Sequence, residues 1–135
     1  MLKDLSVAAV LPASDINRAR EFYRDKLGLE PDNPDAGDNY LFKCGNGTAF
    51  LLYQTGNAGT AKNTQMGWIT DDLDAEMADL RSRGVVFEDY DFPGLKTENG
   101  VATMPDGERG AWFLDTEGNI LSITRCRPRP PDSNA

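Results

Sequence analysis

Apolar and polar residues follow the same pattern twice along this chain. In the first half, the apolar segment SVAAVL predicts a strand, and helical periodicity predicts a helix over 15–27. Ser14 or Asp15 can cap the start of this helix, and Gly28 can end it in a left-handed conformation. The apolar face of the helix consists of Ile16, Ala19, Phe22, Tyr23 and Leu27. Three further strands are expected near 29–32, 39–44 and 48–55.

The second half repeats this order. TQMGWIT predicts a strand, Asp71 or Asp72 can cap a helix over 72–83, and Gly84 can end it. The inner face of this helix consists of Leu73, Met77 and Leu80. Further strand segments are expected at 85–89, 101–105, 110–115 and 120–125.

The spacing of the two halves indicates an internal duplication. Asp15 lies 57 residues before Asp72, and each precedes a predicted helix that ends at a glycine. Phe42 precedes Gly47 by five residues, and Phe113 stands five residues before its own turn glycine. Each half is therefore interpreted as one βαβββ unit, with eight strands and two helices in total, although the second half offers one strand segment more than this unit requires.

The pattern fits a single domain made of two such modules. Module one covers about 1–55 and module two about 64–125, with the small, polar segment GNAGTAKNT between them. The segment 89–100 reads as a long loop with two aromatic residues, and long loops in compact domains often act as lids. The last ten residues, 126–135, are rich in proline and are predicted to be disordered.

Composition narrows the possible partners. The chain has 135 residues and a mass of 14.8 kDa, and no apolar run approaches the roughly 18 residues of a membrane helix. The short apolar N-terminus is interrupted by Pro12 and is interpreted as a strand, so we expect no membrane partner and a cytoplasmic location. A formal net charge of −8 disfavours nucleic acid as a partner, because an acidic surface repels phosphate.

The chain contains no histidine and only two cysteines, Cys44 and Cys126. The absence of histidine excludes every mechanism that needs a histidine base, and it removes the commonest ligand of zinc, iron and nickel. Two cysteines make neither a disulfide framework nor a zinc cluster. No nucleophile with an adjacent base can be assigned, so catalytic residues stay unknown.

Three segments carry a resemblance to a known superfamily. They are LPASDINRAREFYRDKLGL, DDLDAEMADLRSRGVVFE and the hairpin FLDTEGNILSI. In this order and spacing, they resemble the vicinal-oxygen-chelate superfamily of glyoxalases, bleomycin-resistance proteins and extradiol dioxygenases. The resemblance implies an α+β fold of tandem βαβββ modules, whose curved sheets enclose a cleft with helices on the outer side.

The same resemblance locates the positions at which metal-dependent members hold an ion. Their ligands come from the first and last strands of the modules, which correspond here to Ala8, Leu51 or a neighbour, Gln65 and Ser122. Alanine and leucine cannot bind a cation, and the glutamine and serine offer only neutral oxygens. A divalent ion usually needs about three or more protein ligands with imidazole or carboxylate among them, so we expect no metal and no cofactor.

Strand alternation then suggests which side chains face the cleft. Ser122 would share its face with Ile120 and Thr124, whereas Met66 and Trp68 would face the helices. Trp112 corresponds to a position at which fosfomycin-resistance relatives present an aromatic ring to the substrate. The predicted ligand contacts are Gln65, Trp112, Tyr53, Ser122, Tyr90 and Phe92.

Two functions remain open. The first is a metal-free protein that binds a small, aromatic organic molecule and sequesters a drug or natural product, as in antibiotic resistance. The second is an enzyme of the same superfamily, a lyase, isomerase or dioxygenase relative, with an atypical metal or none. Members of the superfamily usually pair, and a lone cleft would leave apolar sheet edges in water, so we expect a homodimer.

Overall fold

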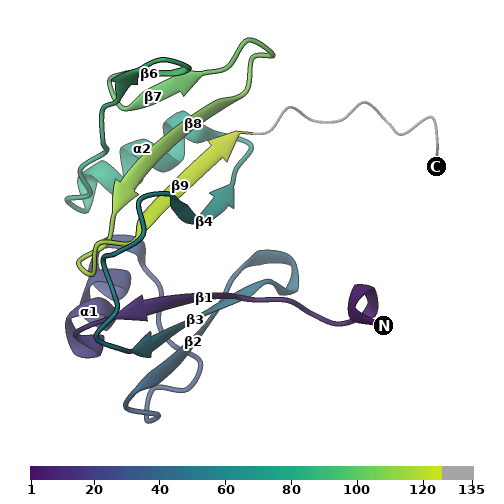
Figure 1. Ribbon diagram of the computed structural model, residues 1–135, viewed down its shortest axis with the longest axis vertical. Coiled ribbons are helices and arrows are strands. Elements are labelled where there is room, and N and C mark those ends of the chain that lie inside the picture. The colour runs from purple at the N-terminus through teal and green to yellow at the C-terminus, as the bar shows by residue number, and fades with distance from the viewer. Residues whose placement is uncertain (126–135) are drawn as a thin grey trace.

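Two modules lie one above the other, with both helices on the same side of the molecule (Figure 1). The structure is a computed structural model, and it describes residues 1–125. Module one comprises the short helix η1 (Leu2–Asp4), β1 (Ala9–Ala13), α1 (Ile16–Leu27), β2 (Asn39–Lys43), η2 (Gly45–Gly47) and β3 (Ala49–Gln54). Module two comprises β4 (Thr64–Ile69), α2 (Leu73–Ser82), β5 (Asp91–Phe92), β6 (Leu95–Glu98), β7 (Val101–Thr103), β8 (Arg109–Leu114) and β9 (Ile120–Arg125).

Each module has its own sheet. The first has the strand order β1-β3-β2, and the second has the order β4-β9-β8-β7-β6-β5. In both sheets the strand before the helix pairs in parallel with the last strand of the module, β1 with β3 and β4 with β9. The remaining pairs are antiparallel. This arrangement confirms the predicted α+β fold of two modules, and it leaves β1 and β4 as edge strands.

The helices begin and end where the sequence indicates. Asp15 caps α1 by accepting a hydrogen bond from the Arg18 amide, and Asp72 caps α2 in the same way through the Ala75 amide. α1 ends at Gly28, whose φ of 71° lies in the left-handed region that favours glycine. The sequence left two candidates open for each cap. The structure shows that Asp15, not Ser14, caps α1 and that Asp72, not Asp71, caps α2.

The two modules share one aromatic core. Tyr23 of α1 contacts Phe50 of β3, with ring centroids 5.6 Å apart, and Phe50 meets Trp68 of β4 edge-on at 6.0 Å. Trp68 in turn lies nearly parallel to Phe113 of β8 at 6.3 Å. Met66 and Trp68 pack against this core, as alternation along β4 predicted. Because aromatic rings bury large areas, these continuous ring contacts stabilise the packing of one module against the other.

The prediction of eight strands is wrong. The structure has nine in residues 1–125, three in module one and six in module two. No strand forms at 29–32, where Pro31 lacks a backbone N–H and only the Asp32 amide bonds to β2, through the Leu41 carbonyl. The segment 85–89 keeps one isolated bridge, between Phe87 and Phe113.

The expected long loop at 89–100 is largely a hairpin. β5 and β6 are joined by Pro93-Gly94, and Gly94 has a φ of 86°. Proline followed by a glycine with positive φ suits a tight turn, so the strands pair across it. The predicted disorder of 126–135 lies outside the described residues. No helix among residues 1–125 is long and apolar enough to cross a membrane.

Candidate functional site

The hairpin between β8 and β9 joins the modules through a buried polar cluster. Asp115 accepts a hydrogen bond of 2.7 Å from the phenol of Tyr23 in α1. Its other oxygen accepts from the Glu117 and Asn119 amides at 2.8 and 2.9 Å, which shapes the turn. The Asn119 side-chain amide donates to the Pro12 carbonyl of β1. Residues of one hairpin thus bind a helix and a strand of the other module.

Glu117 forms the second part of this cluster. Its buried carboxylate accepts hydrogen bonds from the Asp15 amide at 2.9 Å and from the guanidinium of Arg18 at 2.9 and 3.1 Å. Thr116 donates a further bond at 2.8 Å. Burial alone would raise the pKa of Glu117, but the bonds from Arg18, Asp15 and Thr116 outweigh it and lower the pKa to about 2. The carboxylate is therefore charged at neutral pH and serves to fix α1.

Gln65, a predicted ligand contact, also belongs to this network. Its Nε2 donates to Asn119 at 2.9 Å, and its Oε1 accepts from the Ile120 amide at 3.0 Å. The pairing of β4 with β9 shifts register between Thr64 and Met66, so Gln65 occupies a bulge and turns its amide toward the hairpin. Both ends of the amide are engaged within the fold, and contact with a ligand would require one of these bonds to break.

Trp112 and Ser122 are direct partners on β8 and β9. Both lie on the open face, by which we mean the side of the sheets opposite the helices, since Ala111, Phe113, Leu121 and Ile123 face the core. The indole nitrogen of Trp112 donates to the Thr64 hydroxyl of β4 at 3.0 Å, so the ring reaches across β9. On the other side of Ser122, Gly67 approaches so closely that a Cβ there would collide with the serine hydroxyl. Ser122 is consequently only 7% exposed.

Tyr90 and Phe92 extend the aromatic surface from Trp112. The Tyr90 ring meets Trp112 edge-on at 5.9 Å, and Phe92 lies 5.7 Å from Tyr90. Burial, and next the nearby charge of Glu88, raise the pKa of the Tyr90 phenol. Thr97 of β6 holds the segment in place, since it bonds the Tyr90 amide. We call Trp112, Tyr90 and Phe92 the aromatic row.

Tyr53 lies apart from the aromatic row. It is on β3 of module one, opposite Pro12 and Asn39, and its side chain is partly exposed. Leu51, two residues earlier on β3, lies on the same face of the sheet. The structure therefore brings together Trp112, Ser122, Tyr90 and Phe92, whereas Tyr53 belongs to the other sheet.

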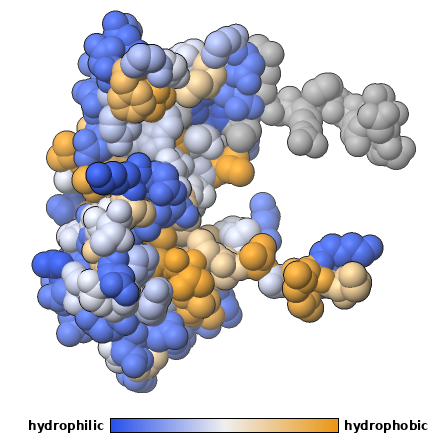
Figure 2. Space-filling view, in the orientation of Figure 1, coloured by the Kyte–Doolittle hydropathy of each residue, from blue (hydrophilic) through white to orange (hydrophobic). Residues whose placement is uncertain are grey.

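Two cavities lie where the modules meet. One, of about 430 Å³, opens near the start of β1 and is lined by Val7, Ala9, Phe50 and Met66 among others. Figure 2 shows the molecule hollowed on this side, with hydrophobic residues along the N-terminal arm. The other cavity, of about 280 Å³, lies on the helix side. Neither cavity is lined by any of the six predicted ligand contacts.

The four positions inferred for metal ligands carry little donor capacity. Ala8 and Leu51 have no polar side-chain atom, the Gln65 amide is engaged, and Ser122 is enclosed by its neighbours. Within residues 1–125, no group of three or more acidic, cysteine or histidine side chains is placed to hold an ion. The residues present do not fit a divalent metal at these positions.

Comparison with solved structures identifies the architecture. A glyoxalase/bleomycin resistance protein from Catenulispora acidiphila is 23% identical and superimposes with a TM-score of 0.71 over 92% of this chain and 100% of that chain. The chain has the glyoxalase/bleomycin-resistance fold. A lactoylglutathione lyase from Agrobacterium tumefaciens shares this fold at 20% identity, with a TM-score of 0.67 over 90% of this chain and 93% of that chain.

A bleomycin-binding protein complexed with bleomycin shares the glyoxalase/bleomycin-resistance fold as well. It is 17% identical, with a TM-score of 0.69 over 91% of this chain and 99% of that chain. No protein-family model and no curated protein sequence matches the chain. At these identities, the likeness concerns the fold, and the chemistry has to be argued from the residues.

Sequence reasoning missed the joining role of Asp115, Glu117 and Asn119. The hairpin was identified as a motif, but only Ser122, beyond its turn, was predicted to have a role. The sequence carries no local signal of this role, because aspartate, glycine and asparagine are also the usual residues of an exposed turn such as DTEGN. The burial of the three side chains depends on Tyr23 and Arg18, about 100 residues earlier, and periodicity along the chain does not report such contacts.

Proposed function

We propose that this protein is a metal-free member of the vicinal-oxygen-chelate superfamily that binds a small, aromatic organic molecule on its open face. The observation that carries the proposal is the aromatic row. Phe92, at its outer end, is 54% exposed, and the row offers ring faces and edges to a flat ligand. Stacking on such rings contributes about 0.5–1.5 kcal/mol per pair beyond the burial of area.

The polar groups beside the row would orient the ligand. The Tyr90 hydroxyl and the Glu88 carboxylate lie close enough for the charge of Glu88 to raise the pKa of Tyr90. Neither side chain is engaged by a hydrogen bond or ion pair within residues 1–125, so both are available to a ligand. Together with the net charge of −8, this favours an aromatic ligand that carries a donor or a positive charge.

Sequestration of a drug or natural product is the role that fits this site. The fold is shared with a bleomycin-binding protein, which supports a protective function of the same kind, as in antibiotic resistance. The proposal places the protein in the cytoplasm, where its thiol at Cys44 would stay reduced.

We further propose that the working form is a homodimer. Val7 and Ile69 are 89% and 75% exposed, and both line the 430 Å³ cavity beside the edge strands β1 and β4. Large apolar side chains at unpaired sheet edges favour association, and a second copy would cover them and complete the hollow. Light scattering should then give about twice the 14.8 kDa of one chain at micromolar concentration.

An enzyme is the second candidate. The likeness to a lactoylglutathione lyase supports it, although the metal positions of this chain offer neutral or apolar side chains. Release of an altered ligand would distinguish the two roles, because a binding protein returns its ligand unchanged.

The test is a fluorescence titration with bleomycin and a panel of aromatic natural products. Trp112→Ala should lose roughly 1–3 kcal/mol of binding free energy relative to the wild type, from burial and stacking combined. Trp112→Phe keeps an aromatic ring at the same place and should lose less. A cognate ligand that binds Trp112→Ala as tightly as the wild type would show that the site lies elsewhere.

A further inference from the structure

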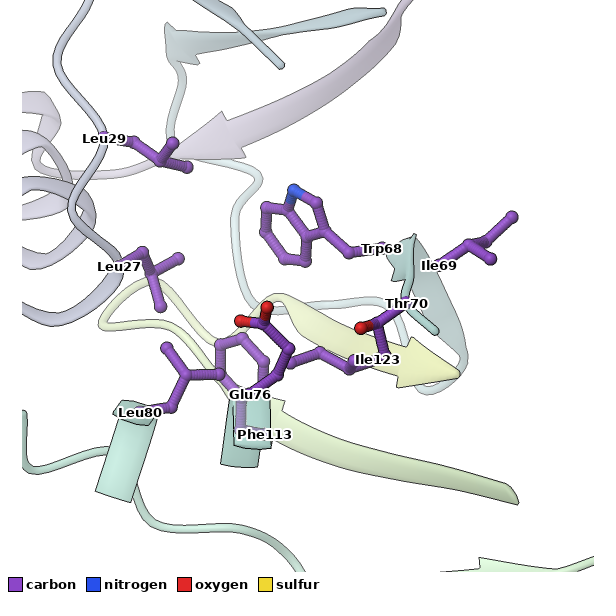
Figure 3. Close-up of a pocket in the computed structure, with 9 residues that line it drawn as sticks. All are labelled: Leu27, Leu29, Trp68, Ile69, Thr70, Glu76, Leu80, Phe113 and Ile123. Carbon is purple, nitrogen blue, oxygen red and sulfur yellow. The ribbon is translucent and has the colours of Figure 1, made fainter. Parts of the chain in front are cut away.

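The helix-side cavity has a composition unlike that of a void left by imperfect packing. It lies between the end of α1, the middle of α2 and the core side of β4 and β9, and its volume is about 280 Å³. Figure 3 shows the side chains around it, which come from both modules. The apolar part of the lining consists of Leu27, Leu29, Ile69, Leu80, Phe113 and Ile123, with Trp68 between the modules.

The ends of the two helices brace one flank of this cavity. The guanidinium of Arg83, which follows α2, lies against Gly28 at the end of α1, where a Cβ would stand 3.2 Å from it. Reciprocally, Lys26 of α1 lies against Gly84, where a Cβ would stand 2.5 Å from its Nζ. Cations are favoured at helix C-termini, so each helix supplies a cation to the end of the other. These contacts place each cation beside the C-terminal end of the other helix.

A single carboxylate lines the cavity. Glu76, in the first turns of α2, is exposed to solvent, and Figure 3 shows its carboxylate turned toward the leucines and aromatics that line the same cavity. Among residues 1–125, no hydrogen bond or ion pair engages this carboxylate. Arg83, which follows α2, pairs with Asp79 of that helix.

Trp68 adds an aromatic wall. Its ring is packed edge-on to Phe50 and offset-parallel to Phe113, so its orientation is fixed by the core. An aromatic face attracts a positive charge through its quadrupole, and tryptophan does so most strongly. A fixed indole, an unengaged carboxylate and an aliphatic floor together match one kind of molecule, a positive charge carried on an apolar body.

We propose that the helix-side cavity is a second binding site and that it takes a small organic monocation. The ammonium group lies between the Glu76 carboxylate and the indole of Trp68, and the apolar body rests on Leu27, Leu29 and Leu80. The site is separate from the open face, because Trp68 points to the core side of β4 whereas Trp112 lies on the opposite side of the sheet. The inference is independent of the ligand proposed for the aromatic row.

The chain holds two tryptophans, one at each site, and this makes a direct experiment possible. Each indole N–H gives one resonance in a ¹H–¹⁵N spectrum, and Trp112→Phe removes one of the two and so assigns both. The probes are benzyltrimethylammonium, the neutral benzyl alcohol and the anionic benzenesulfonate, each titrated into the full-length protein at constant ionic strength.

Benzyltrimethylammonium should shift the Trp68 resonance saturably in the wild type and in Trp112→Phe, and the other two probes should bind more weakly. Glu76→Gln removes the charge with little change of shape and should weaken the binding of the cation by roughly fivefold to tenfold. Glu21→Gln, the same change on the exposed face of α1, should leave the affinity unchanged.

Three outcomes would overturn the proposal. They are a Trp68 resonance that the cation does not move, an affinity that Glu76→Gln leaves unchanged, and equal binding of benzyl alcohol and the cation. If the aromatic row does not bind the aromatic ligand, this will appear in the titrations of the Trp112 variants instead. The two proposals can therefore fail separately.

Discussion

The phenol oxygen of Tyr23 lies 2.7 Å from Oδ2 of Asp115, and both side chains are buried at the junction of the two modules. Burial, followed by the charge of Asp115 and the hydrogen bond to it, raises the pKa of Tyr23 well above its usual value. The phenol therefore stays protonated and donates to a carboxylate 92 residues away in the chain. This one contact connects α1 with the hairpin between β8 and β9.

Tyr23→Phe should lower the free energy of unfolding by about 1–3 kcal/mol, because it removes a donor from a buried carboxylate. Chemical denaturation followed by circular dichroism measures the change. Tyr40→Phe is the matched control, since Tyr40 is also buried but, within residues 1–125, its oxygen meets only the Arg20 guanidinium, at 3.3 Å. A loss for Tyr23→Phe no larger than that for Tyr40→Phe would contradict the role assigned to the contact.

Glu117 should make the free energy of unfolding depend on pH. Its pKa is about 2 in the folded chain against 4.5 for an ordinary glutamate, so the folded state binds its proton less readily than the unfolded state. The resulting stabilisation, about 3 kcal/mol, is complete above pH 4.5 and is lost as the pH falls toward 2. In Glu117→Gln this pH dependence should be absent.

The measurement is the free energy of unfolding of both proteins at several pH values between 2 and 7. The difference between wild type and Glu117→Gln should shrink as the pH falls. Parallel curves over this range would show that the Arg18 and Asp15 contacts do not lower the pKa of Glu117 in solution.

The close approach of Gly67 and Ser122 gives a third prediction. Gly67→Ala should destabilise the pairing of β4 with β9 by about 1–3 kcal/mol, since the new methyl group collides with the serine hydroxyl. Ser122→Gly removes that hydroxyl, so the double variant should be more stable than the sum of the two single effects implies. Thermal unfolding of the four proteins measures the coupling, and strictly additive effects would rule out the contact.

The fold could be predicted from the sequence because its signals are local. Asp15 and Asp72 cap helices within three residues, and Gly28 ends one by its own backbone geometry. The hairpin at Pro93-Gly94 has an equally local turn signal. It was nevertheless predicted to be part of a long loop, because the segment 89–100 is long. The strand expected at 29–32 did not form, because Pro31 in the middle of this segment has no backbone N–H to donate to a neighbouring strand.

The site was less predictable, because it depends on contacts across the chain. Alternation turned Ser122 toward the cleft and the resemblance did the same for Trp112, but neither could show that Gly67 and the Trp112 ring enclose the serine. A bulge in β4 took Gln65 out of the alternating pattern, and its amide found Asn119 of the distant hairpin. Bulges and buried polar clusters of this kind leave little trace in periodicity.

The same contacts lead to the last prediction, which concerns metal ions. A divalent ion at Gln65 and Ser122 would have to break the bonds of the Gln65 amide to Asn119 and to the Ile120 backbone, and it would have to displace the Trp112 ring from Ser122. In return it would gain two neutral oxygens, which do not offset the cost of dehydrating the ion. Zinc, nickel, manganese and magnesium should therefore leave the thermal unfolding midpoint unchanged, and a chelator should alter neither stability nor ligand binding. A stoichiometric ion in protein purified without chelator, together with a midpoint raised by several degrees, would reverse this conclusion and favour the enzyme.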